Sequence, residues 1–146
     1  GGRRDRDEPD TRPAAKEEVS AQALRLTLQS MASHADAPMV QQYGCGTLYN
    51  VVIANPAMRQ ALTQEGGVPV LLGAMRHHPM EPGTQINACA LLKELAEYQP
   101  ALQLIEDGGG RALLLSALQN HQYNDELLTR ATEALRYLPE ELKLDE

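Results

Sequence analysis

The sequence contains no tryptophan and no phenylalanine, and aromatic residues make up only 3% of its 146 residues. Its apolar character comes instead from leucine and alanine, which favour helix. The β-branched and aromatic residues that favour strands are scarce. A chain of this length can bury a single hydrophobic core. These properties predict an all-α protein.

Cysteine and long apolar runs are scarce as well. The two cysteines, Cys45 and Cys89, do not form a CxxC pair. Apolar runs such as 112–115 are far too short to span a bilayer, and no signal peptide begins the chain. We therefore expect an intracellular, cytoplasmic protein with reduced thiols, and a nuclear location stays open.

Positive charge is in deficit, because 13 Lys and Arg face 20 Asp and Glu, a net charge of −7. Residues 19–146 hold eight of the basic and fourteen of the acidic residues. An acidic body repels phosphate backbones and anionic membrane surfaces. The charge therefore argues against nucleic acid and against a membrane as partners.

Residues 1–18 combine mixed charge with two prolines and show no apolar periodicity. Such a segment buries too little surface to offset its ordering entropy, which predicts a disordered charged tail. A charged docking arm is the functional alternative. The domain then spans 19–146, with an acidic C-terminal end at 139–146.

From residue 19 on, the sequence repeats itself with a period of 43 to 44 residues. Residues 55–75 align with 99–118: both open with a proline, reach a glycine pair and enter an apolar helix. This period excludes tetratricopeptide and ankyrin repeats, which are about ten residues shorter. It divides the domain into a partial repeat 19–54, a repeat 55–98 and a repeat 99–138. Four apolar columns fall in register: Leu28, Leu72 and Leu115; Met31, Met75 and Leu118; Leu48, Leu92 and Leu135; Val51, Leu95 and Leu138.

Each full unit is expected to contain three helices. A short first helix (57–65) ends at Gly66-Gly67 or, one period later, at Gly108–Gly110, which serve as left-handed caps. The second helices are expected at 68–77 and 111–120, and the third at 84–98 and 125–138. Helix breaks are predicted near 34–38, 65–68, 78–83, 107–111 and 120–124.

The segments NPAMRQALTQEGGVPVLLGAMRHHP and CGTLYNV resemble the armadillo repeat family, and the resemblance covers about residues 20–138. It implies an all-α, armadillo-type right-handed helical solenoid of about three repeats, the first one incomplete. It also implies a concave groove lined by third helices. The family's groove asparagine corresponds to Asn50, Glu94 and Tyr137, and its tryptophan to Gly46, Ala90 and Glu133. Only Asn50 matches, so the groove is expected to be shallow and acidic.

No catalytic or metal site is predicted. His34, His78 and His121 recur at one repeat position, but neighbouring helices lie about 8–10 Å apart, too far for one ion to join them. The same spacing keeps Cys45 and Cys89 from a disulfide and favours small buried core cysteines. The Gly108–Gly110 run has neither the preceding strand nor the GK[ST] ending of a phosphate loop. The chain is therefore not expected to be an enzyme or to need a cofactor.

A repeat solenoid presents a long surface without a deep pocket, which suits protein recognition. We therefore expect a protein–protein interaction module or scaffold that binds a partner segment along the concave third-helix face. The absence of Lys and Arg from both groove columns suggests a basic segment or helix as that partner. The expected partner-binding residues are Gln42, Asn50, Glu94, Glu97, Glu133 and Tyr137.

The alternative is a structural assembly element that associates with itself through an uncapped solenoid end. The first repeat lacks its first helix, and an end without a polar cap leaves an apolar face unfinished. Val19, Leu24 and Met31 are the candidates for this homo-oligomeric contact.

Overall fold

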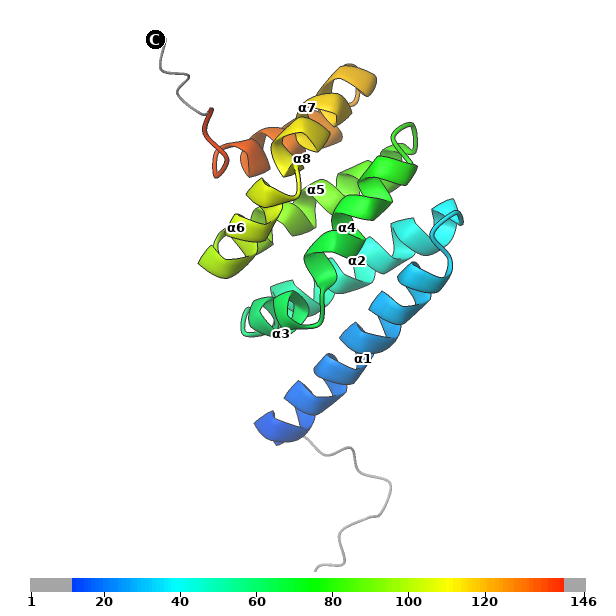
Figure 1. Ribbon diagram of the computed structural model, residues 1–146. Helices are drawn as coiled ribbons and strands as arrows, with labels where there is room; N and C mark the ends of the chain where they lie inside the picture. The colour runs from blue at the N-terminus through cyan, green and yellow to red at the C-terminus, as the bar shows by residue number, and fades with distance from the viewer. Residues whose placement is uncertain (1–11, 141–146) are drawn as a thin grey trace, which may run out of the picture.

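A computed structural model describes residues 12–140, and all regular elements in that range are α-helices (Figure 1). The all-α prediction is therefore confirmed. None of the described helices is long and apolar enough to cross a membrane. The helices are α1 (Pro13–Ser33), α2 (Pro38–Ala54), α3 (Met58–Gln64), α4 (Gly67–His77), α5 (Pro82–Ala96), α6 (Gln99–Asp107), α7 (Gly110–Asn120) and α8 (Asp125–Leu135).

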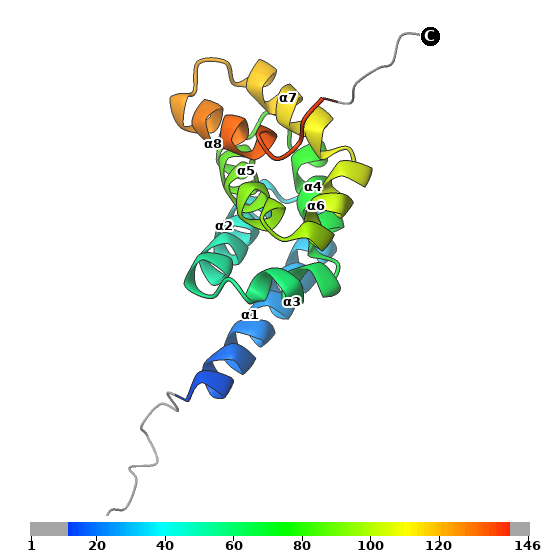
Figure 2. The same cartoon turned by 90° about the vertical axis from the view of Figure 1, so that its left-hand side faces the viewer.

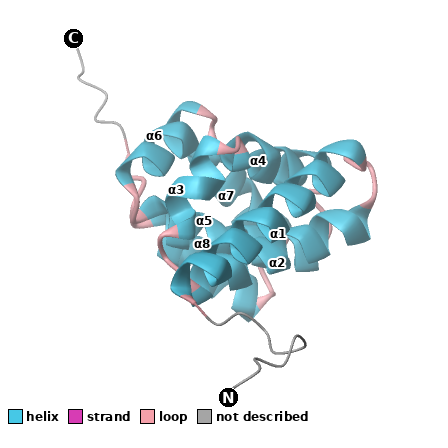
Figure 3. Ribbon diagram, turned by 90° about the horizontal axis from the view of Figure 1, so that it is seen from below, coloured by secondary structure: helices cyan, strands magenta, loops and turns pink. Residues whose placement is uncertain are grey.

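The long helices form two layers. α2, α5 and α8 lie side by side in one layer, and α5 packs against both of its neighbours (Figure 1). α1, α4 and α7 form the other layer, where each packs against the next helix of the chain (Figure 2). The short helices α3 and α6 lead into α4 and α7, and loops join all the elements (Figure 3). After α2, the chain therefore forms a short helix followed by two longer helices twice, first as α3, α4 and α5 and then as α6, α7 and α8.

Helix α1 begins at Pro13, earlier than the sequence analysis predicts. Residues 13–18 fall in the expected disordered tail but form the first turns of this helix, while residues 1–11 lie outside the described range. Proline is tolerated in a first helical turn, and the alanines and charged residues that follow have high helix propensity. The tail boundary at residue 18 is therefore wrong, because mixed charge here marks an exposed helix.

The predicted helix breaks all occur. Gly66 has φ 78° and Gly109 has φ 81°, the left-handed region in which a side chain is strained, so both caps are confirmed. Each glycine lets the chain turn directly from a short helix into the next longer one. The third helices differ in their ends: α5 starts at Pro82 rather than 84, and α8 stops at Leu135 rather than 138.

One continuous hydrophobic core runs through the described helices. Most residues of the four apolar columns are buried, including Leu48 at 0% and Leu92 at 1% exposure. Their counterparts in the last unit are more open, and Leu115 reaches 44%. Burial in this core is therefore less complete in the last unit, although Leu138 there is still buried.

Two buried glutamines fix the connections between the layers. The Nε2 of Gln41 donates to the carbonyls of Met31 and His34, each at 2.9 Å. One period later, the Nε2 of Gln85 donates to the carbonyl oxygens at the end of α4, at 3.1 and 2.9 Å. Carbonyls at a helix end lack the regular intrahelical partner of the helix interior, and the glutamine amides add a hydrogen bond to each of them. The glutamines therefore close the ends of α1 and α4 inside the protein.

We expect Leu92→Ala to lower the free energy of unfolding by about 2–5 kcal/mol, because the side chain is buried between α2 and α8 and leaves a cavity. Leu135→Ala, at the equivalent and only partly buried position one period later, should cost less. Denaturant unfolding of both variants measures this. Equal losses would mean that α5 is not packed on both sides.

Candidate partner-binding face

The six residues predicted to bind a partner lie on α2, α5, α8 and the turn after α8. Asn50 is exposed on α2, whereas Gln42, Glu133 and Tyr137 are half-buried. We call the surface of α2, α5 and α8 that carries them the third-helix face. The structure joins only part of this set into one site.

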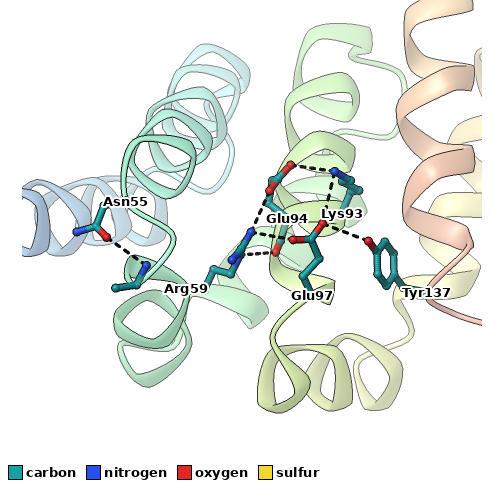
Figure 4. A network of polar contacts seen from close by, with 7 residues as sticks. Asn55, Arg59, Lys93, Glu94, Glu97 and Tyr137 are labelled. Atoms are coloured by element: carbon teal, nitrogen blue, oxygen red, sulfur yellow. Dashed lines mark hydrogen bonds and ion pairs between the residues drawn. The ribbon is translucent and has the colours of Figure 1, made fainter.

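Glu94 and Glu97 meet at an arginine absent from the predicted set, and Tyr137 joins them through Glu97 (Figure 4). Arg59, on α3, donates from Nε to the backbone carbonyl of Glu94 at 2.7 Å. Its Nη2 lies 3.2 Å from Glu94 Oε2 and 3.0 Å from Glu97 Oε2. The Tyr137 hydroxyl donates to Glu97 Oε1 at 3.2 Å. One network therefore links α3, the end of α5 and the turn after α8.

Lys93 supplies a second cation. Its Nζ lies 3.2 Å from Glu94 Oε1 and 3.5 Å from Glu97 Oε1. The hydrogen bond with Glu94 is the largest of the effects that raise the pKa of Lys93 above its usual 10.5. Desolvation, followed by the hydrogen bond to Glu97, raises the pKa of Tyr137. Both groups therefore keep their protons at neutral pH.

The third-helix face is consequently less acidic than the sequence analysis expects. Two carboxylates of the network face two cations, Arg59 and Lys93. Glu133 is the third carboxylate among the predicted binding residues. It lies on α8, three residues after Arg130 and three before Arg136, which is the C-cap residue of that helix. Within the network, two carboxylates are therefore matched by two cations, which weakens the attraction of Glu94 and Glu97 for a basic ligand.

Gln42 is held by the packing of α2 against α5. Its carbonyl accepts a hydrogen bond from Asn87 Nδ2 at 3.0 Å, and its side chain lies where a Cβ on Gly83 would overlap it. Glycine at position 83 leaves room for the Gln42 amide, which would have to move if a Cβ were added. Gln42 therefore lies against α5 but stays half-exposed, and its assignment to partner binding remains a prediction.

The two cations were missed for different reasons. Arg59 precedes its carboxylates by 35 and 38 residues, so no local pattern connects them. Lys93 and Glu97 stand four residues apart on one helix, a spacing that identifies an ion pair from sequence. The positions compared with the armadillo groove all lie on third helices. Arg59 lies on α3, so that comparison could not find it.

The residues proposed for self-association divide in the same way. Leu24 is 0% and Met31 is 1% exposed, so both belong to the chain's own core and cannot meet a second copy. Val19 is 67% exposed. The assignment of Leu24 and Met31 to a homo-oligomeric contact is therefore wrong, while that of Val19 remains a prediction.

The histidines of the repeat column end helices. His34, His78 and His121 follow α1, α4 and α7 directly, as C-cap residues. Nε2 of His78 donates to the Ala35 carbonyl at 2.7 Å, and Nε2 of His121 donates to the Pro79 carbonyl at 2.8 Å. The prediction that they cap loops is confirmed. Among the described residues, no group of three His, Cys, Asp or Glu is arranged to hold a metal ion.

Both cysteines are free and buried, Cys45 on α2 and Cys89 on α5. Burial raises the pKa of each thiol from 9.0 to about 12. At neutral pH both are therefore neutral thiols, which are poor nucleophiles and poor metal ligands.

These thiols should make the fold sensitive to alkali. Because the folded pKa of about 12 lies above the unfolded value of 9.0, their contribution is intact below pH 9.0 and is lost as the pH rises toward 12. We expect the unfolding free energy to fall as the pH rises above about 9 and toward about 12. The variant with Cys45→Ala and Cys89→Ala should show a shallower fall. An unchanged slope in that variant would contradict the assignment.

The network should contribute to stability through Arg59. Arg59→Met leaves Glu94, whose side chain is only 13% exposed, without its arginine, and we expect a loss of about 1–3 kcal/mol. Arg25→Met, at an exposed position of α1, should change stability by less than about 0.5 kcal/mol. Adding Glu94→Gln to Arg59→Met should recover part of the loss. Urea unfolding measures the free energy of unfolding of each variant. Equal losses for Arg59→Met and Arg25→Met would show that the network does not contribute to stability.

Comparison with known proteins gives little beyond this geometry. No protein-family model matches the chain, and no solved structure matches it significantly. The chain is similar to protein aardvark of Dictyostelium discoideum, with 36% identity over 87 residues. The match covers 53% of this chain and 11% of that protein. The chain therefore resembles one segment, about a tenth of the length, of a much longer relative.

Proposed function

We propose that this chain is a protein–protein interaction module of the armadillo type, a right-handed solenoid of about three repeats with an incomplete first one. A partner segment lies along the third-helix face. The observation that carries the proposal is that α2, α5 and α8 lie side by side in the same layer, each one period apart in the sequence. This arrangement repeats similar positions along one surface, which suits an extended ligand.

Asn50 is the recognition residue for the partner's backbone. It is exposed on α2, and its amide offers both donors and an acceptor. Glu97, at 36% side-chain exposure, and Tyr137 present a polar edge further along the face. Together they can fix the register of a bound segment through hydrogen bonds.

The partner need not carry a run of basic residues. A basic segment would have to displace Arg59 and Lys93 from Glu94 and Glu97, because those carboxylates already have cationic partners. A segment with polar side chains and little net charge meets the face without that cost. Its affinity should then depend only weakly on ionic strength.

A photoreactive amino acid at position 50 or 133 tests the proposal in cell lysate. We expect both positions to cross-link to the same protein, and position 119, exposed on α7, to give no such product. Asn50→Ala should reduce the cross-link formed from position 133. Salt up to about 0.5 M should leave the yield nearly unchanged. Cross-links from position 119 alone, or none from 50 and 133, would contradict a partner on the third-helix face.

A further inference from the structure

An apolar surface, distinct from the third-helix face, lies at the end of the molecule formed by α1 and α2, far from α7 and α8 (Figure 1). Large side chains are exposed there: Val19 is 67%, Leu26 57%, Met39 52% and Tyr43 66% accessible. A cleft of about 330 Å³ separates the two helices and is lined by Thr27, Ser30, Met39 and Tyr43, among others. We call this surface the α1–α2 end face and define it by Val19, Ala23, Leu26, Ser30, Met39, Tyr43 and Thr47.

The corresponding surface of the next unit is largely covered: Met39 and Tyr43 become Gly83 and Asn87, which are half-buried, and four further positions are buried. Advancing by 44 residues takes the residues that line the cleft onto α4 and α5, which pack against α1 and α2. Thr27, Ser30, Val40 and Thr47 become Leu71, Ala74, Thr84 and Leu91, whose exposures are 0%, 3%, 0% and 0%. Within residues 12–140, the α1–α2 end face is thus the same kind of surface without a covering helix pair.

The opposite end of the molecule is built differently. Positions that admit a following unit are small in the first two units, Gly46 and Ala90, and become Glu133 in the last. The buried Cys45 and Cys89 are likewise replaced by Thr132, which is exposed. A head-to-tail contact would bury this glutamate against the apolar end face of a second copy, which is unfavourable for an unpaired charge. The α7–α8 end is therefore a poor cover for the α1–α2 end face.

A second α1–α2 end face fits better. None of the seven residues that define it is charged, although the chain has a net charge of −7, so two copies can meet there with little local repulsion. Helices of 21 and 17 residues are about 32 and about 26 Å long, and two packed helices are about 20 Å wide. The face then offers about 600 Å² per copy, near the lower limit for a specific dimer.

We propose that two copies of this chain pair through their α1–α2 end faces as a two-fold symmetric dimer. In such an isologous contact the same patch serves both copies. Tyr43, Met39 and Leu26 supply the buried apolar area, and tyrosine and methionine are both enriched in protein interfaces. The modest area makes the dimer a reversible one, and the third-helix face of each copy stays open.

Sedimentation velocity over a wide range of protein concentration tests the proposal on the whole chain. We expect a concentration-dependent dimer for the wild type, and monomers for Leu26→Glu and for Tyr43→Glu, because each places two charges in the contact. The matched control is Leu115→Glu, at a half-exposed leucine of the α7–α8 end, which should dimerise like the wild type. Circular dichroism confirms that each variant remains helical.

The geometry of the contact is tested by a flexible bis-maleimide cross-linker. Ser30→Cys should give a covalent dimer, whereas Ser116→Cys, exposed on α7, should not. The wild type should not react, because Cys45 and Cys89 are buried. Failure of Ser30→Cys to cross-link in a solution where sedimentation finds dimers would overturn the two-fold arrangement.

A wild type that stays monomeric at millimolar concentration would overturn the proposal, and a different protein captured through Tyr43 would then identify the cover. Loss of the dimer in both Leu115→Glu and Leu26→Glu would replace it by head-to-tail stacking, because that contact uses both ends of the molecule. Both results are independent of the third-helix face, whose cross-links test the partner-binding proposal separately.

Discussion

The position of α5 between α2 and α8 is the constraint on which the rest of this structure depends. Nine residues of α5 are buried, against three of α8, because α5 is covered on both sides and α8 on one. Small residues allow the close approach: Gly83 gives room to Gln42, and Gly46 contacts Asn87. The buried glutamine of α5 also closes the end of α4. The hydrophobic core, the connection after α4 and the order of helices in the layer therefore all depend on the packing of α5.

The polar network follows from the same packing. Because α5 ends beside α3 on one side and the turn after α8 on the other, Glu94 and Glu97 come within reach of Arg59 and Tyr137. Glu94 and Glu97, which would give the third-helix face a negative field, are thereby paired with Arg59 and Lys93 of the same chain. In the proposed function this turns the face from an electrostatic site into a polar one, where hydrogen bonds carry recognition.

The fold was largely predictable because its signals are local and repeated. Leucine-rich columns, two glycine caps and proline-marked helix starts determine the helices and their breaks. The site was predictable only in part. Arg59 reaches Glu94 from another helix across 35 residues. The burial of Leu24 and Met31 depends on the helices packed against α1, with Gly44 of α2 lying against Met31, and periodicity within one helix does not reveal such contacts. Residues 13–18 were mistaken because charged helix and charged tail have similar composition.

Native-state hydrogen exchange of the wild-type chain tests most directly whether α5 is the centre of the structure. Amides in the middle of α5, around Leu91 and Leu92, should exchange more slowly than those of any other described helix, and only through global unfolding, because both flanks must leave before they open. The first turns of α1 should exchange fastest among the helices, since the residues there are largely exposed. If α5 exchanges as fast as the start of α1, α5 is not held between α2 and α8, and the account fails.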